Sequence, residues 1–186
     1  PIAELAADLD VGCFRGSEKD VLHRVLSAAR AHKADLIVET TGDCPLIDPD
    51  LVELCIQAYL GTNVDYVSNV LERTYPVGMD TQVFSTDILA DVAKRTDHPD
   101  DREHVSLYIY RHPEIYSLKN IPGPSELSWP NLRLTLDTPA DFENLRFIFE
   151  TLYPTNPCFD LADVLELVRC NTHLSSLNLD IRDKNG

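Results

Sequence analysis

Two aspartates in this chain each follow a short apolar run and stand just before a predicted helix. Asp43 follows the run at 36–38 (LIV), and Asp137 follows the alternating run at 131–136 (NLRLTL). Both runs are too short for helices and are rich in strand-forming residues, so each predicts a strand, the first of them buried and central in the sheet. In open α/β sheets, ligands bind at the carboxyl ends of such strands. If the two strands are parallel, both carboxylates reach the same edge of the sheet.

This pair of carboxylates predicts a magnesium site. Mg²⁺ usually takes one or two protein carboxylates and leaves its other positions to substrate phosphates and water. Either aspartate alone could equally well be present to cap a turn or helix. The two together are stronger evidence for a metal site than either one alone. The D-x-D sequence at Asp48-Pro49-Asp50 is a poor alternative metal site, because Asp48 is expected to cap the helix that begins at Pro49.

The cysteines indicate reduced thiols. Their number is odd, their spacing is wide and no C-x-x-C occurs, which is unlike a disulfide framework or a zinc site. Cys44 directly follows Asp43 and could be read as a nucleophile, although a small half-buried residue at a strand end is the favoured interpretation. The five are Cys13, Cys44, Cys55, Cys158 and Cys170.

The composition and charge of the chain argue against some classes of function. The chain has 186 residues and a net charge of −15, which argues against general nucleic-acid binding because phosphate backbones need clustered Lys and Arg. No apolar run is long enough to span a bilayer and no signal peptide is visible, so we expect a cytoplasmic protein with no membrane or nucleic-acid partner. The opening residues (PIAELAADLDVGCF) resemble the second half of a βα unit, so we expect an N-terminal segment to be missing.

Predicted strands and helices alternate along the chain. This favours one α/β domain over residues 1–186, with three layers and a mostly parallel sheet. The stretch at 102–121 breaks the alternation and could be an insertion for dimerisation, so we expect a homodimer. Strands are predicted at 11–14, 36–40, 65–70, 77–84, 115–121 and 131–136, and helices at 17–32, 49–60, 86–95, 103–110, 139–153 and 161–169.

Six segments resemble the nucleotide-sugar cytidylyltransferases. Thr41–Ile47 (TGDCPLI) is similar to their G-D-x-P-L/F-I motif and Leu136–Phe142 (LDTPADF) to their D-T-P-x-D motif. Four further segments are similar to the spore-coat-polysaccharide (SpsF-like) type, which is related to CMP-Kdo and CMP-acylneuraminate synthetases. They are Cys13–Leu22 (CFRGSEKDVL), Asp65–Asn69 (DYVSN) with Tyr75–Asp80 (YPVGMD), and Arg102–Val105 (REHV).

The resemblance implies a fold, a reaction and residue roles. The fold would be GT-A-like, or Rossmann-like, and the reaction would join CTP to a sugar, expected to be acidic, giving a CMP-sugar and pyrophosphate for surface polysaccharide or glycoconjugate synthesis. In related synthetases the aspartates that match Asp43 and Asp137 bind Mg²⁺, which is the expected cofactor. Arg73 is a candidate catalytic residue. Substrate-binding candidates are Arg15, Asp80, Glu103 and His104, each with a purely structural alternative.

One departure from the family pattern is large. The family begins with a loop like A-R-x-G-S-x-R-L-P-G-K that holds the nucleotide phosphates, and nothing in this sequence resembles it. We therefore expect this chain to bind CTP weakly and to turn it over poorly or not at all. A non-catalytic relative that binds a sugar or a partner is the alternative to an enzyme, and a glycosyltransferase with a D-x-D site is disfavoured.

Overall fold

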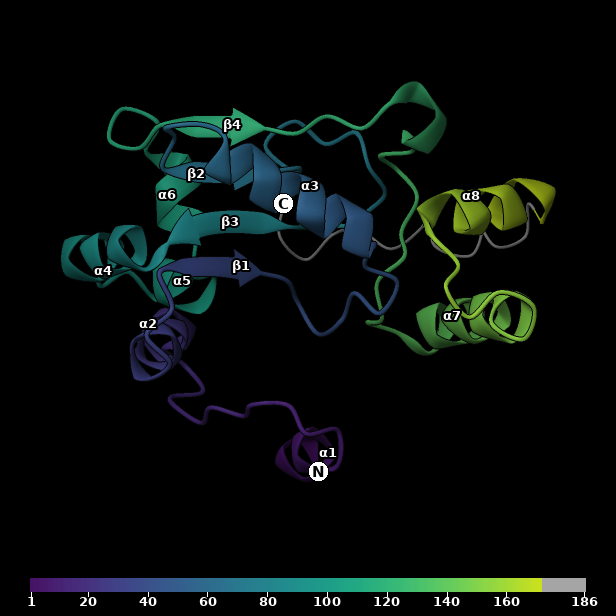
Figure 1. The fold of residues 1–186 in the computed structure, drawn as a ribbon, viewed down its shortest axis with the longest axis horizontal. Helices are drawn as coiled ribbons and strands as arrows, with labels where there is room; N and C mark the ends of the chain where they lie inside the picture. Colours follow the sequence, from purple (N-terminus) through teal and green to yellow (C-terminus); the bar gives the residue numbers. More distant parts are fainter. Residues whose placement is uncertain (172–186) are drawn as a thin grey trace. The chain divides into compact units, whose positions relative to one another are not determined.

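Helices and strands alternate along the computed structural model, which describes residues 1–171 (Figure 1). The strands are β1 (Leu36–Glu39), β2 (Tyr66–Ser68), β3 (Gln82–Ser85) and β4 (Leu118–Asn120). The helices are α1 (Ile2–Asp8), α2 (Val21–Ala31), α3 (Pro49–Leu60), α4 (Thr86–Arg95), α5 (Pro99–Glu103), α6 (Leu107–Arg111), α7 (Pro139–Leu152) and α8 (Leu161–Cys170), with a 3₁₀ turn, η1, at Ser125–Leu127. The predicted α/β class is confirmed.

The four strands form one sheet with the order β1-β3-β2-β4. The backbone N–H of Asn69, after β2, donates to the carbonyl of Thr81, before β3, over 3.4 Å. The N–H of Thr86, after β3, donates to the carbonyl of Asp35, before β1, over 2.9 Å. Both bonds join the end of one strand to the start of the other, so β3 is antiparallel to its two neighbours. The sheet is mixed, and the prediction of a mostly parallel sheet is only partly right.

The position of β1 differs from the prediction. Among the described strands, β1 lies at one edge of the sheet, so the expectation that Asp43 follows a central strand is wrong. Only Ile37 of this strand is buried, whereas Val38 is exposed. A strand at an edge lacks a neighbour on one side, which explains why its apolar run is not covered as a central strand would be.

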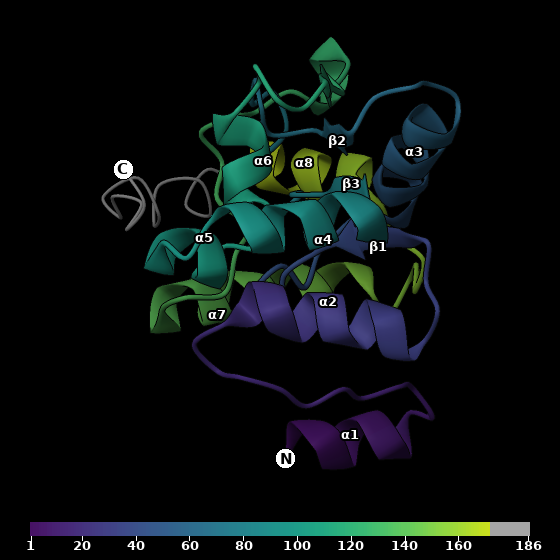
Figure 2. The same ribbon diagram turned by 90° about the vertical axis from the view of Figure 1, so that its left-hand side faces the viewer.

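The chain folds into two compact units. The first comprises residues 1–37 and 84–118. Within it α2 packs against α4 and α5 (Figure 2). Its core includes Leu22 and Leu26 of α2 with Leu89 and Val92 of α4. Residues 11–14 form no strand, contrary to the prediction.

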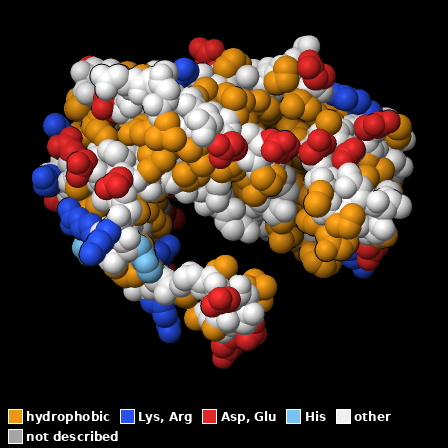
Figure 3. All heavy atoms as spheres, in the orientation of Figure 1, with side chains coloured by type: hydrophobic (Ala, Val, Ile, Leu, Met, Phe, Trp, Pro, Cys, Tyr) orange, Lys and Arg blue, Asp and Glu red, His pale blue; other side chains and the backbone are white. Residues whose placement is uncertain are grey.

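Helix α1 buries none of its side chains. Its apolar residues follow the helical spacing read from the sequence, but Ile2, Leu5 and the following Leu9 are all exposed. Figure 3 shows hydrophobic side chains on the surface of this helix.

The second unit comprises, among the described residues, 38–83 and 119–171. Here α3 packs on β2 and α7 on α8, and the buried side chains include Cys55, Tyr66, Ile148 and Leu165. The predicted strand at 131–136 is wrong, because it forms only an isolated parallel bridge, between Arg133 and Val77.

The predicted starts of α3, α4 and α7 are confirmed. Asp48 caps α3 and is followed by Pro49; Ser85 caps α4. Thr138 caps α7, again with a proline in the first turn. Each cap satisfies backbone N–H groups that the first helical turn leaves unpaired. Two other predicted starts are wrong: the helix predicted at 17–32 begins at Val21, and two short helices, α5 and α6, replace the one predicted at 103–110.

Two predictions about the whole chain stay predictions: a single domain over 1–186, and dimerisation through 102–121. None of the helices between residues 1 and 171 combines the length and apolar character that crossing a bilayer requires.

Candidate active site

The two predicted metal-binding aspartates are brought together by a backbone hydrogen bond. The N–H of Leu136, the residue before Asp137, donates to the carbonyl oxygen of Asp43 over 2.8 Å. Both residues belong to the second compact unit. The Asp137 side chain is 44% exposed, and Asp43 is half-buried. The strand pairing that the sequence suggested is absent, but its main consequence, two carboxylates on adjacent backbone segments, is present.

A third segment, which carries Asp80, contacts the same stretch. The Val77 N–H donates to the carbonyl of Leu132 over 2.9 Å, and the Leu134 N–H donates to the carbonyl of Val77 over 2.8 Å. Gly78 then has a φ of +104°. A Cβ there would lie 3.0 Å from the carbonyl carbon and oxygen of Leu134. Only a glycine allows this close approach, and the turn that it makes ends the pairing after one bridge.

Asp80 and Arg73 form a bidentate ion pair. Arg73 Nη1 donates to Asp80 Oδ1 over 2.7 Å, and Arg73 Nη2 donates to Asp80 Oδ2 over 2.8 Å. Both side chains are 29% exposed. Such a fork-to-fork pair fixes the orientation of both groups. The structure therefore joins a predicted catalytic residue to a predicted substrate-binding residue, which the sequence reading had treated separately.

Asn69 holds the backbone on either side of Asp80. This fully buried side chain donates from Nδ2 to the carbonyl of Met79 over 2.6 Å and accepts from the N–H of Thr81 at Oδ1 over 2.9 Å. Buried amides that satisfy two backbone groups rigidify a segment. In the sequence, Asn69 belongs to a segment that resembles the family, but no role was predicted for it. Its burial could not be predicted, because a polar residue after a strand is usually exposed.

Cys44 is buried and directly follows Asp43 in the sequence. Its Sγ is 3.1 Å from Thr41 Oγ1 and donates to Asp43 Oδ1 over 3.7 Å. Burial raises the pKa of the Cys44 thiol to about 11; the hydrogen bond with Thr41 opposes this rise, and the negative charges of Asp43 and Asp80 add to it. The thiol is therefore protonated at neutral pH, which supports the structural interpretation over the nucleophile.

Alkylation should report this environment. Since the pKa of Cys44 is about 11 and that of an ordinary thiol about 9, its thiolate fraction at pH 8 is about 100-fold smaller. We expect iodoacetamide to label Cys44 at least about 100-fold more slowly than the exposed Cys13 or Cys158, as measured by peptide mass spectrometry. The raised pKa also stabilises the fold below pH 9, and this stabilisation should be lost as the pH rises toward 11. Equal labelling of Cys44 and Cys13 at pH 8 would contradict the assignment.

Asp48 does not serve a D-x-D metal site. Its Oδ1 accepts from the N–H of Asp50 over 2.8 Å and more weakly from Leu51, and its Oδ2 accepts from the N–H of Leu161 over 3.0 Å. The buried carboxylate thus caps α3 and ties the start of α8 to it. Both oxygens are used in structural hydrogen bonds, as the sequence reading expected for a cap.

The remaining predicted substrate-binding residues belong to the first compact unit. Arg15 is exposed, and Glu103 and His104 are exposed at the end of α5. Their neighbour Arg102 has a structural role, because it donates to Asp97 over 2.9 Å and to the carbonyl of Ala93 over 3.2 Å. The cluster around Asp43 is thus built from the second unit, and the roles of Arg15, Glu103 and His104 stay predictions.

The chain is similar in sequence to known proteins. A family model described as cytidylyltransferase matches residues 2–169. The chain is 33% identical over 186 residues to the uncharacterized protein MJ1063 of Methanocaldococcus jannaschii, covering 98% of this chain and 73% of that protein. It is 34% identical over 140 residues to the spore coat polysaccharide biosynthesis protein SpsF of Bacillus subtilis, covering 74% of this chain and 56% of SpsF.

A solved structure has the same fold. It is a cytidylyltransferase from Leptospira borgpetersenii serovar Hardjo-bovis, with a TM-score of 0.89 and 30% identity, and the match covers 97% of this chain and 75% of that one. The family match, the relatives and the fold agree with the sequence motifs. The chain therefore belongs to the cytidylyltransferase family.

Proposed function

We propose that this protein transfers CMP from CTP to a hydroxyl group of a sugar and releases pyrophosphate. The sugar is expected to be acidic and the product to serve surface polysaccharide or glycoconjugate synthesis, a role that the name of the relative SpsF supports. The observation that supports the proposal is the backbone hydrogen bond from Leu136 to Asp43, which joins the chain segments that carry Asp43 and Asp137. Membership of the family supports CTP as the nucleotide.

The proposed reaction is an in-line displacement at the α-phosphorus of CTP. The sugar oxygen forms a bond to this phosphorus, the bond from the phosphorus to the oxygen bridging it to the β-phosphate breaks, and pyrophosphate leaves with that electron pair. The hydroxyl proton passes to solvent. Catalysis of this kind depends mainly on positioning and on stabilisation of phosphate charge.

Mg²⁺ fits the two aspartates. Within residues 1–171 there is no group of three or more His, Cys, Asp or Glu side chains arranged to hold a metal. A site of two carboxylates completed by substrate phosphates is the arrangement that Mg²⁺ commonly adopts. Asp43 and Asp137 would hold the ion. When bound, it would neutralise charge on the triphosphate.

The other residues of the cluster would bind and orient the substrates. We propose that Arg73, oriented by its bidentate pair with Asp80, contacts phosphate, and that Asp80 contacts the acceptor sugar. Arg15, Glu103 and His104 are proposed to bind substrate, and the active protein is proposed to be a homodimer.

Release of pyrophosphate tests this function directly. The full-length protein is incubated with MgCl₂, one of the four ribonucleoside triphosphates and either acidic or neutral sugars, and pyrophosphate is measured by a coupled enzyme assay. We expect release with CTP and an acidic sugar, and none when EDTA replaces MgCl₂. If CTP gives no pyrophosphate with any sugar, the non-catalytic alternative is favoured; a sugar that then binds without turnover would support it.

A further inference from the structure

The turn that carries Asp137 is anchored by a buried carboxylate. Asp141 in the first turn of α7 is 0% exposed. Its Oδ2 accepts the N–H of Asp137 over 3.0 Å, the N–H of Thr138 over 2.8 Å and the hydroxyl of Thr138 over 2.9 Å. Three donors to one oxygen fix the backbone of Asp137. They leave the second oxygen of Asp141 for another partner.

Arg133 links this anchor to the side chain of Asp137. Its Nη2 donates to Asp137 Oδ2, and its Nε lies 3.9 Å from Asp141 Oδ1. The Arg133 side chain is only 12% exposed, and its backbone is held by the parallel bridge to Val77. The Arg133 guanidinium thus lies near both the buried carboxylate of Asp141 and the candidate metal ligand Asp137. The backbone of Arg133 is itself held in place by the bridge.

The charges around the site are consistent with a divalent cation. Asp80 is neutralised by Arg73. Asp43, Asp137 and Asp141 together carry three negative charges, and Arg133 supplies one positive charge. The remaining two negative charges equal the charge of Mg²⁺. Arg133 therefore reduces the repulsion among the carboxylates without removing the attraction for a cation.

From this geometry we propose that Arg133 is a positioning residue for Asp137. By binding Oδ2, it holds the carboxylate in one orientation and directs Oδ1 toward the metal. The inference rests on the proposed function, because it requires that Asp137 binds Mg²⁺. Partners that orient metal-binding carboxylates commonly change metal affinity or activity 10–100-fold when they are mutated.

Binding of Mn²⁺ tests the proposal without measuring turnover. Free Mn²⁺ is followed by electron paramagnetic resonance as the protein is added. Because Arg133→Met alone would leave Asp141 buried without its counter-charge, the main variant is the double variant Arg133→Met/Asp141→Asn, which neutralises both partners. Arg133→Lys keeps the charge but loses the planar fork. Arg146→Met removes an exposed arginine of α7 that pairs only locally with Glu143, and it serves as the control.

We expect the double variant to bind Mn²⁺ about 10–100-fold more weakly than the wild type, Arg133→Lys to lie between them, and Arg146→Met to match the wild type. Melting curves show whether the double variant is folded; if it is not, Arg133→Lys alone decides. Wild-type or tighter Mn²⁺ binding by the Arg133 variants, with weak binding by Asp43→Asn, would overturn the positioning role and leave the proposed function standing. Equal binding by the wild type and Asp43→Asn would overturn the positioning role together with the metal site at Asp43, while pyrophosphate release from CTP separately decides the proposed function.

Discussion

Replacement of Asp43 by Asn is expected to reduce magnesium-dependent pyrophosphate release from CTP on the order of 10²- to 10⁴-fold, and Asp137→Asn should have a similar effect. Charge stabilisation by a bound metal contributes several kcal/mol to such reactions, and each 1.36 kcal/mol corresponds to a factor of ten in rate. Each variant keeps the shape of the side chain and the backbone hydrogen bond from Leu136 to Asp43, but removes one carboxylate charge. The measurement is kcat/KM for CTP at several MgCl₂ concentrations.

Asp50→Asn is the matched control for this experiment. Asp50 is an exposed aspartate only a few residues after Asp43, and its side chain lies in the first turn of α3 rather than in the cluster. It should retain wild-type kcat/KM and the same dependence on MgCl₂. If Asp43→Asn or Asp137→Asn were as active as this control, the corresponding residue would have to be removed from the proposed metal site.

The sequence predicted local features of the fold well. Asp48 before Pro49, and Thr138 before Pro139, are cap signals that depend only on neighbouring residues, and α3 and α7 begin where these signals place them. The direction of β3 and the edge position of β1 depend instead on which strands pair across the chain. No local pattern specifies that pairing, and the predicted parallel sheet with a central β1 differed from the structure for this reason.

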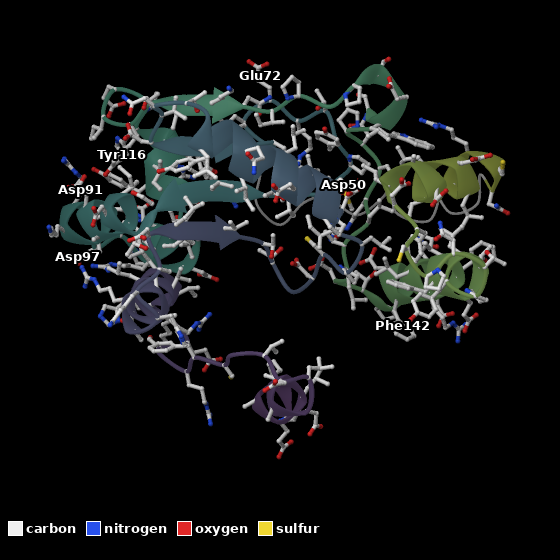
Figure 4. All side chains as sticks on the ribbon, viewed as in Figure 1. Asp50, Glu72, Asp91, Asp97, Tyr116 and Phe142 are labelled. Carbon is white, nitrogen blue, oxygen red and sulfur yellow. The ribbon has the colours of Figure 1, made fainter. Side chains whose placement is uncertain are left out.

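Phe142 illustrates the limit of apolar spacing. The helical spacing of apolar residues at 139–153 alone would predict that Phe142 faces inward from α7, but its side chain, labelled in Figure 4, is 52% exposed. The buried face of α7 contains Asp141 and Asn144 as well as Leu145 and Ile148. Because two polar residues take part in that face, the buried stripe is rotated relative to the one that apolar residues alone would define.

The candidate site was predicted in part. The sequence placed the segments of Asp43 and Asp137 next to each other, as the backbone hydrogen bond from Leu136 to Asp43 shows, and their metal-binding role stays a prediction. Arg133 and Asp141 were missed. No local signal pointed to Arg133, because four positions along an extended chain span about 13 Å; its contact with Asp137 depends on the bend at residues 137 and 138. The T-P-x-D sequence at 138–141 fits a capping box, which the structure contains. The ion pair between Arg73 and Asp80 depends on a turn between them, so residue spacing in the sequence could not predict it.

Gly78→Ala should destabilise the protein by at least about 1–3 kcal/mol, the usual cost of a residue in a sparsely populated backbone region. At a φ of +104°, alanine is strained, and its Cβ would lie 3.0 Å from the backbone of Leu134. For a chain of this size, such a change corresponds to a decrease in Tm of roughly 3–10 °C. Thermal unfolding followed by circular dichroism measures it.

Gly42→Ala is the control that separates the strain expected at Gly78 from the general effect of replacing a glycine by alanine. Gly42 lies in the motif that carries Asp43, yet a Cβ there meets no atom within 4 Å and its φ is not in the left-handed region. Alanine at such a position usually changes stability little or raises it by about 0.4–1 kcal/mol, because it restricts the unfolded chain. An equal loss of Tm in the two variants would mean that the close approach at Gly78 is not what holds the Asp80 segment against the Asp137 segment. A loss confined to Gly78→Ala, with weaker Mn²⁺ binding, would tie the geometry of the site to this one turn.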